Sequence, residues 1–365
     1  MPANQTDDGY RRFGGELPSG CDPRLAEARS EPMALGFSHG RAALDWLIRR
    51  RGPFAAALVC AYTCPTVPRF FESRGLAIGR FDVAAPAAGL IAVAAGLPGR
   101  LLVLVPALLG FDPWLDVAAL AGTLGPRALV TIDAAQTAFG HRRYPPPPGG
   151  AVLAGPRKTT AAADGAWLVL DGATGADRRS VEVLPEATRA VRAKQTARAL
   201  LAARDPALEA RALALIQEAE AAWPDQPCRL GDNSRTLLAD LDAEAHNARR
   251  LANRARLREL LEPTLPAVAV AGIGAGVPFC HAVLTDDRAG LLARLRSRRV
   301  FATALWPDAV VVPGPGPDPD ADPYPYPQAA TLARHLLALP VDQRYTVSDM
   351  ERLAALVLDA LPPQP

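Results

Sequence analysis

Short apolar runs alternate with amphipathic segments between residues 36 and 170 of the 365-residue chain. The runs have the length of buried strands and lie at 56–61, 101–105, 128–132, 152–153 and 167–170. Between them, apolar residues recur at helical spacing in 41–49 and 114–124. Strands that alternate with helices are typical of βαβ units, so the pattern predicts an α/β domain with a largely parallel sheet.

After Val181 the chain changes to long segments rich in Ala, Leu, Arg and Glu. Their spacing predicts helices at 186–203, 206–222 and 237–261. A second domain follows, with predicted strands at 267–272 and 278–284, a helix at 287–298 and a proline-rich surface loop at 312–327. Ser348 and Glu351 have capping-box spacing, which would open a last helix with the apolar stripe Met350, Leu353, Ala354 and Val357.

Composition narrows the function classes. The formal net charge is +2 and the basic residues are scattered, so the sequence lacks the basic patch that is typical of a nucleic-acid-binding protein. Proline and glycine repeatedly interrupt the most apolar stretch, 83–109, and the amino-terminal segment lacks an apolar leader. The five cysteines and five histidines show no metal-ligand spacing. We therefore expect a cytoplasmic protein with reduced thiols, no metal site and neither membrane nor nucleic-acid partners.

Lysine is rare, because only Lys158 and Lys194 occur among the 40 lysine and arginine residues. Where any cation suffices the chain uses arginine, so a lysine is a candidate for chemistry that needs a primary amine, such as condensation with an aldehyde. Lys194 lies in a helical pattern, where we expect it on a solvated face. Lys158 stands in a Gly/Pro/Thr/Ala loop between two short strands, which is a poor site for a solvated lysine.

Two further segments could serve a cofactor that reacts with this amine. Asp133 ends an apolar run, and an acid at the carboxyl end of a buried parallel strand faces the crevice where ligands of open α/β sheets bind. A helix N-cap is the alternative role for Asp133. Gly40 precedes a helical pattern, so Arg41 and Ala42 could present backbone N–H groups to a phosphate, although a glycine there could equally serve a turn.

The order of these segments resembles the DegT/DnrJ/EryC1/StrS family of sugar aminotransferases, which use pyridoxal 5′-phosphate (PLP). The family's S-G-T-A-A-L and E-D-A-A-Q segments, and its lysine followed by an acidic-glycine pair, are similar to HGRAAL (39–44), IDAAQ (132–136) and KTTAAADG (158–165). GRFDV (79–83), Gly110 and LPVDQRYTVSDMERL (339–353) also fall where the family has similar segments. The resemblance thus spans nearly the whole chain.

The resemblance implies an α/β fold of the aspartate-aminotransferase type. Its large PLP-binding domain (36–230) would hold a mainly parallel seven-stranded sheet, with a smaller α+β C-terminal domain (231–365) and an N-terminal arm (1–35). It also implies a homodimer with sites at the interface.

The resemblance further implies roles for single residues. Lys158 would condense with the PLP aldehyde, Asp133 would pair with the pyridine nitrogen, and Gln136 would contact the ring hydroxyl region. The remaining cofactor contacts would come from the phosphate segment Gly40, Arg41 and Ala42, from a ring-stacking side chain that is either Tyr62 or Cys64, and from Asn233 of GDNSR, which would reach the neighbouring subunit's cofactor phosphate.

The sequence departs from the family at the phosphate segments. Arg41 replaces the usual threonine, and the stretch 153–156 lacks the usual serine. Arg41 could compensate electrostatically or point to solvent, and Arg41, His39 and Arg157 are candidate cations for anionic substrates. The loop HRRYPPPPGG (141–150) also departs from the family and could reshape the substrate pocket.

The resemblance implies a transaminase that moves an amino group from an amino acid, glutamate being expected, to a keto group, expected on a nucleotide-linked sugar. One alternative is a PLP-dependent deoxysugar dehydratase, but in those relatives the lysine is commonly replaced by histidine, and Lys158 is present here. The other is a PLP-fold binding or regulatory protein that has lost turnover.

Overall fold

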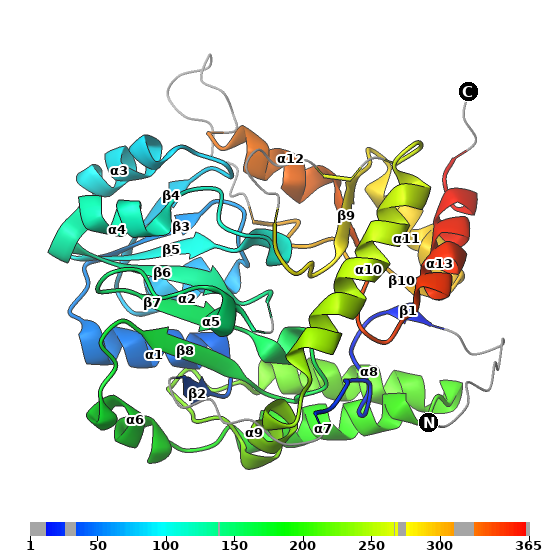
Figure 1. Ribbon diagram of the computed structural model, residues 1–365, viewed down its shortest axis with the longest axis horizontal. Coiled ribbons are helices and arrows are strands. Elements are labelled where there is room, and N and C mark those ends of the chain that lie inside the picture. The colour runs from blue at the N-terminus through cyan, green and yellow to red at the C-terminus, as the bar shows by residue number, and fades with distance from the viewer. Residues whose placement is uncertain are drawn as a thin grey trace.

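The computed structural model describes residues 12–25, 34–137, 139–265, 267–268, 275–309 and 325–362. Its main feature is a seven-stranded sheet with the order β2-β8-β7-β6-β5-β3-β4 (Figure 1). The strands are β2 (Leu35–Phe37), β3 (Ala56–Cys60), β4 (Ala77–Phe81), β5 (Leu101–Pro106), β6 (Ala128–Ala134), β7 (Ala151–Ala154) and β8 (Ala166–Leu170). Strands β3 to β7 are parallel, whereas β8 is antiparallel to both β7 and β2. The predicted α/β class and mainly parallel seven-stranded sheet are confirmed.

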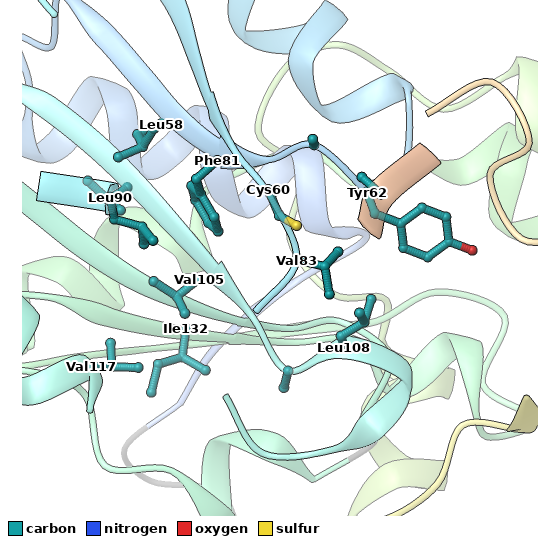
Figure 2. Close-up of a cluster of buried hydrophobic side chains, with 14 of the residues drawn as sticks. Leu58, Cys60, Tyr62, Phe81, Val83, Leu90, Val105, Leu108, Val117 and Ile132 are labelled. Carbon is teal, nitrogen blue, oxygen red and sulfur yellow. The ribbon is translucent and has the colours of Figure 1, made fainter. Parts of the chain in front are cut away.

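Helices cover both faces of this sheet, because its central strands present apolar side chains to both faces. In β3, for example, Leu58 belongs to one hydrophobic cluster and Val59 to another. The cluster of Leu58 packs against α3 (Ala87–Gly96) and α4 (Val117–Leu124), and Figure 2 shows its side chains converging. The cluster of Val59 packs against α1 (Gly40–Arg51), α2 (Thr66–Ser73) and α6 (Gly175–Glu182). Strands buried on both faces read as continuous apolar runs, which explains why they were predictable.

The carboxyl-terminal part forms its own core. Its elements are α9 (Asp232–Ala239), α10 (Ala243–Leu261), β9 (His281–Leu284), α11 (Arg288–Ser297), β10 (Val300–Phe301), α12 (Pro327–His335), β11 (Leu336–Leu339) and α13 (Val347–Asp359). Strands β9 and β11 pair antiparallel, and α10, α11 and α13 pack against them (Figure 1). The amino-terminal strand β1 (Phe13–Gly14) pairs with β10 and buries Phe13 in this core.

Two long helices, α7 (Thr188–Ala202) and α8 (Pro206–Ala221), lie side by side along the lower edge of the molecule in Figure 1. Small residues such as Ala197 and Ala212 meet between them. The remaining elements are short: η1 (Leu108–Gly110), η2 (Gly125–Arg127), α5 (Gly140–Arg143) and η3 (Pro156–Lys158).

The predicted elements that lie in the described residues are present, but the boundaries of two helices were wrong. The helix predicted at 237–261 is divided into α9 and α10, because Asp242 caps α10 by accepting hydrogen bonds from the N–H groups of Glu244 and Ala245. The capping box of α13 is formed by Thr346 and Asp349, two residues earlier than the predicted pair. Several elements were not predicted: strands β1, β2, β4, β10 and β11, and helices α2, α3, α6 and α12.

Some predictions lie outside the described residues. These are most of the proline-rich loop 312–327, most of the strand at 267–272 and part of the arm 1–35. Ala267 is described and forms an isolated antiparallel bridge with Val283. The domain boundaries near residues 36 and 231 stay a prediction.

Candidate active site

A cavity of about 610 Å³ opens at the carboxyl ends of the parallel strands. Residues at or just after the ends of β3, β5, β6 and β7 line it, together with the amino end of α1 and side chains from α7 and α8. The crevice beyond the carboxyl strand ends is where open α/β sheets bind ligands. The cavity contains the predicted residues Gly40, Arg41, Tyr62, Asp133, Gln136 and Lys158.

Lys158 ends the turn η3, which directly follows β7. Its side chain extends into the cavity, where water can reach it although protein atoms surround it. Burial lowers the pKa of this amine below its ordinary value of 10.5, and the nearby charge of Asp133 partly restores it. A lowered pKa leaves more of the amine neutral, which is the form that attacks an aldehyde.

Asp133 lies near the end of β6 and faces the same cavity. Its Oδ1 accepts a hydrogen bond from the N–H of Ala135 at 3.0 Å. Burial raises the pKa of this carboxyl, while the amine of Lys158 lowers it. The two groups therefore act on each other within one enclosed space. No helix begins directly after Asp133, so the alternative N-cap role is not supported.

Gly155 allows the two strand ends to approach each other. A Cβ on Gly155 would lie 2.2 Å from the carbonyl oxygen of Ala135, well inside contact distance. The loop that carries Lys158 can thus pass close to the backbone that follows Asp133 only with glycine at this point.

Gln136 supports the neighbouring turn. Its Oε1 accepts a hydrogen bond from the N–H of Leu109 at 2.8 Å, and Leu109 has a φ of 57°, in the left-handed region. The side chain is buried and lines the cavity. Gln136 therefore fixes the backbone around Gly110, which was noted only as a family-like position.

The amino end of α1 reaches the cavity through Gly40 and Arg41, whereas Ala42 lies on the buried face of the helix. His39 is the N-cap residue, and no side chain caps the helix there. The Nη1 of Arg41 donates to Thr66 Oγ1 at 3.3 Å. The first N–H groups of a helix have no partner inside the helix, so they can bind an anion.

Tyr62 and Cys64 both line the cavity, but in different environments. The Tyr62 hydroxyl donates to the carbonyl oxygen of Leu305 at 2.8 Å, and its ring lies 5.2 Å from that of Trp306. Tyr62 also belongs to the hydrophobic cluster in Figure 2. Cys64 is partly exposed, with its Sγ 3.1 Å from Thr66 Oγ1. Which of the two would stack on a ring stays a prediction.

Asn233 is exposed in the first turn of α9 and does not line the cavity of its own chain. Nearby, the Gly231 N–H donates to Asp164 Oδ2 at 2.9 Å, so the acidic residue after Lys158 holds the start of α9. A role for Asn233 toward a second subunit stays a prediction.

The prediction that Lys194 lies on a solvated face was wrong. Lys194 is only 3 % exposed and lines the cavity, with its Nζ paired to Glu220 and 3.6 Å from Glu16. Lys194 does lie in a helix, α7, as its periodicity predicts, but the residues that cover it come from α8 and from the amino-terminal segment, which no local pattern connects to Lys194.

Arg198 is the main residue that sequence reasoning missed. It is 1 % exposed, and its guanidinium donates to the main-chain carbonyl oxygens of Arg157 at 3.1 Å and Thr160 at 3.0 Å, as well as to that of Ala162. It also pairs with Glu16. Arg198 therefore holds the backbone on both sides of Lys158.

The carbonyl oxygen of Thr159, next to Lys158, is also held. It accepts hydrogen bonds from Gln343 Nε2 at 2.8 Å and lies 3.0 Å from His246 Nε2. Because the loop is fixed by groups from α7, from α10 and from the segment between β11 and α13, the direction of the Lys158 side chain is set by tertiary contacts.

Among the described residues, no group of three or more His, Cys, Asp or Glu side chains is placed to hold a metal ion. Within the same residues, every helix is too short or too polar to cross a bilayer.

No family model and no curated protein matches this sequence. Solved structures match its fold over most of its length. DesI, solved in the presence of its TDP-sugar product, is 15% identical with a TM-score of 0.60, covering 97% of this chain and 96% of that chain. DesV from S. venezuelae, solved with a ketimine intermediate, is 18% identical with a TM-score of 0.58, covering 98% and 92%.

A DegT DnrJ EryC1 StrS aminotransferase from Brucella abortus is 13% identical with a TM-score of 0.52, covering 89% of this chain and 85% of that chain. At such identities a likeness establishes the fold, and the match extends across both the sheet and the carboxyl-terminal part. The chain therefore has the fold of the DegT/DnrJ/EryC1/StrS sugar aminotransferases.

Proposed function

We propose that the chain is a PLP-dependent aminotransferase that moves an amino group from an amino acid, glutamate being expected, to a keto group of a nucleotide-linked sugar. The observation that carries this proposal is the meeting of Lys158 and Asp133 in one cavity at the carboxyl ends of the strands. The fold match supports it, because DesI was solved with a TDP-sugar product.

The residues present fit the cofactor. Lys158 is an accessible amine with a lowered pKa, and Asp133 is an enclosed carboxylate that would keep a ring nitrogen protonated. The amino end of α1, at Gly40 and Arg41, offers N–H groups to a phosphate. When bound, PLP supplies an electron sink for the electron pair left on the substrate carbon.

The chain's own groups would perform the remaining steps. Lys158 would hold the cofactor aldehyde until a substrate amine displaces it, and the freed amine would then move a proton to and from the substrate carbon. At the opposite end of the ring, the carboxylate of Asp133 would keep the proton on the ring nitrogen. Gln136, fixed against Leu109, would orient the ring from the side of β6.

The proposal includes a compartment and an oligomeric state. All five cysteines are free, which suits a reducing compartment, and we place the protein in the cytoplasm for that reason. The exposed position of Asn233 leaves it available to a second copy, and we propose a homodimer in which it reaches the partner's site.

Reductive trapping tests the proposal directly. The protein is incubated with PLP, reduced with borohydride and digested, and the modified lysine is identified by mass spectrometry. The chain has only two lysines, Lys158 and Lys194, and both line the cavity. The mass of the labelled peptide therefore shows which of the two has reacted. We expect label on Lys158, none in Lys158→Ala, and retained label in Lys194→Met. Label on Lys194 alone would refute the assignment.

A second measurement separates an aminotransferase from a binding protein that has lost turnover. Glutamate is added to the PLP-loaded protein and the visible absorbance of the bound cofactor is followed. We expect the band to disappear as the amino group is transferred, and 2-oxoglutarate to form in equal amount. A band that persists while Lys158 is labelled favours a binding protein without turnover. This alternative is tested because the usual phosphate hydroxyls are absent at positions 41 and 153–156.

A further inference from the structure

The amino end of α1 is surrounded by hydrogen-bond donors. The helix spans twelve residues, has no acidic residue in its first turn and has no side chain that caps it. Three of its N–H groups, on Gly40, Arg41 and Ala42, precede the first residue that can bond within the helix. Arg157, on the turn that carries Lys158, lines the same cavity. These groups favour an anion with acceptors only, such as a phosphate dianion.

His39 adds a buried donor that has no partner. The side chain is 1 % exposed and lines the cavity, and its Nε2 makes no hydrogen bond to any residue that the structure describes. Burial, followed by the charges of Arg157 and Arg41, lowers its pKa to about 3, so the ring is neutral at physiological pH. Its Nδ1 lies 2.9 Å from Ser38 Oγ, which has no other acceptor among the described residues. The Ser38 hydroxyl therefore donates to Nδ1, and the proton of the ring stands on Nε2.

Trp223 holds His39 and Arg157 in place. The His39 ring stacks on the Trp223 ring with centroids 5.0 Å apart and an interplanar angle of 26°. The Arg157 guanidinium carbon lies 5.2 Å from the centroid of the same indole. Both donors are thus positioned by one rigid aromatic side chain beyond the end of α8.

Glu220 on α8 neutralises this donor cluster. Its Oε1 lies 3.4 Å from Arg157 Nη1 and also pairs with Lys194 Nζ. Burial would raise the pKa of this carboxyl, but the charges of Arg157 and Lys194 outweigh it and hold the pKa near 2. Its side chain is nevertheless 47% exposed, so it can turn toward solvent. Glu220 is therefore an anion bound to Arg157, the cation that a ligand phosphate would contact.

We propose that His39 and Arg157 form a cofactor-phosphate subsite with the amino end of α1, and that Glu220 is the resident counter-ion that the phosphate displaces. This subsite rests on the proposed function. In it, the imidazole N–H of His39 and the guanidinium of Arg157 take the place of the family's hydroxyls, which are missing at positions 41 and 153–156. Glu220 then keeps Lys194 neutralised and returns to Arg157 when the phosphate leaves.

Binding measurements test the subsite without turnover. The quenching of tryptophan fluorescence, to which Trp306 in the cavity wall and Trp223 behind His39 and Arg157 contribute, gives the affinity for PLP, for pyridoxal and for inorganic phosphate. Arg157→Gln and His39→Phe are expected to weaken PLP binding at least roughly tenfold each, since each removes a hydrogen bond to a charged group, while pyridoxal binding stays unchanged. Glu220→Gln is expected to tighten PLP and inorganic phosphate binding roughly threefold, because the competing carboxylate is gone.

The pair Arg189 and Glu218 provides matched controls on α7 and α8, the helices that carry Lys194 and Glu220. Glu218 is 44% exposed and lies 3.0 Å from Arg189, so Glu218→Gln and Arg189→Gln break a comparable ion pair that does not line the cavity. Neither is expected to change any of the three affinities. Equal losses of PLP and pyridoxal binding in Arg157→Gln, or weaker phosphate binding in Glu220→Gln, would overturn the inference.

A nucleoside diphosphate, added to the PLP-loaded protein, distinguishes the cofactor phosphate from a substrate phosphate. If Arg157→Gln weakens only nucleoside diphosphate binding, the subsite belongs to the substrate and the inference fails. Trapping of pyridoxal on Lys158 reports on the proposed function separately, because pyridoxal has no phosphate. If Lys158 is labelled but Arg157→Gln leaves PLP binding unchanged, only the subsite is refuted. If Lys158 is not labelled but inorganic phosphate still binds and can be displaced, only the proposed function is refuted.

Discussion

Arg198 donates a hydrogen bond to the main-chain carbonyl oxygen of Arg157, 3.1 Å away and directly before Lys158. The same guanidinium reaches the carbonyl oxygens of Thr160 and Ala162 beyond the lysine. A buried arginine that binds main-chain carbonyl oxygens on both sides of a residue fixes the path of the backbone there. Arg198 is therefore a positioning residue for Lys158, although it lies 40 residues further along the chain.

Arg198→Met is expected to lower the free energy of unfolding by about 3 kcal/mol, because it leaves three carbonyl oxygens and Glu16 without their buried donor. It should also slow the trapping of pyridoxal on Lys158, measured under conditions where the variant remains folded. Arg192→Met, a substitution on the same helix outside this network, provides the control. A variant that loses stability but labels Lys158 at the native rate would show that Arg198 stabilises without positioning.

Asp133→Asn is expected to lower the pKa of Lys158 further. Burial already lowers this pKa and the charge of Asp133 raises it, so removing the charge leaves only the lowering effect. At a pH between the pKa of Lys158 in the wild type and its pKa in the variant, the neutral fraction of the amine is then larger in the variant. Competitive acetylation of the apoprotein across a pH series, quantified by mass spectrometry, gives the pKa directly. An unchanged or raised pKa would show that the two groups do not interact.

The same variant should retain PLP trapping on Lys158 but lose most of its transamination, because an amide cannot hold a ring nitrogen in its protonated form. The comparison of label yield with turnover separates the two effects. Asp45→Asn is unsuitable as a control, since Asp45 holds Arg49 and Arg74 in ion pairs; Asp116→Asn, at the amino end of α4, is remote from the cavity and preserves a capping residue.

Gly155→Ala is expected to destabilise the protein by about 2 kcal/mol, because its Cβ would lie 2.2 Å from the Ala135 carbonyl oxygen and force the two loops apart. The displacement should also reduce trapping on Lys158. Gly89→Ala in α3 is the matched control, since its Cβ would meet nothing closer than 3.9 Å and alanine favours a helix. The control should equal or exceed the wild type in thermal stability.

Asp177 predicts a pH dependence of stability at the other end of α1. Burial opposes ionisation, but hydrogen bonds from Arg50 and Thr174 lower its pKa from 3.8 to about 2. A depressed pKa contributes stability that is present above pH 3.8 and is lost as the pH falls through 2. Asp177→Asn should therefore reduce the melting temperature at pH 6 but not at pH 2, by an equivalent of about 1 kcal/mol or less, because Arg50 is partly exposed.

The sequence by itself determined the α/β class and most of the sheet. The strands β3, β5, β6, β7 and β8 were predictable because strands buried on both faces read as nearly continuous apolar runs. Strands β2 and β4 were not, since β2 has only three residues and β4 carries an exposed and a half-buried position. The scarcity of lysine and the position of Asp133 at a strand end also indicated the cavity residues, because both depend on local sequence alone.

Tertiary structure decided what surrounds those residues. Lys194 has the local pattern of a surface lysine, yet Glu220 and Glu16 cover it, and they lie on separate segments. The contacts of Arg198 join α7 to a loop about 40 residues earlier in the chain, and Gln343 holds Thr159 from the far end of the sequence. Periodicity reports which face of a helix is apolar, but it carries no information on which distant charges will meet that helix once the chain has folded.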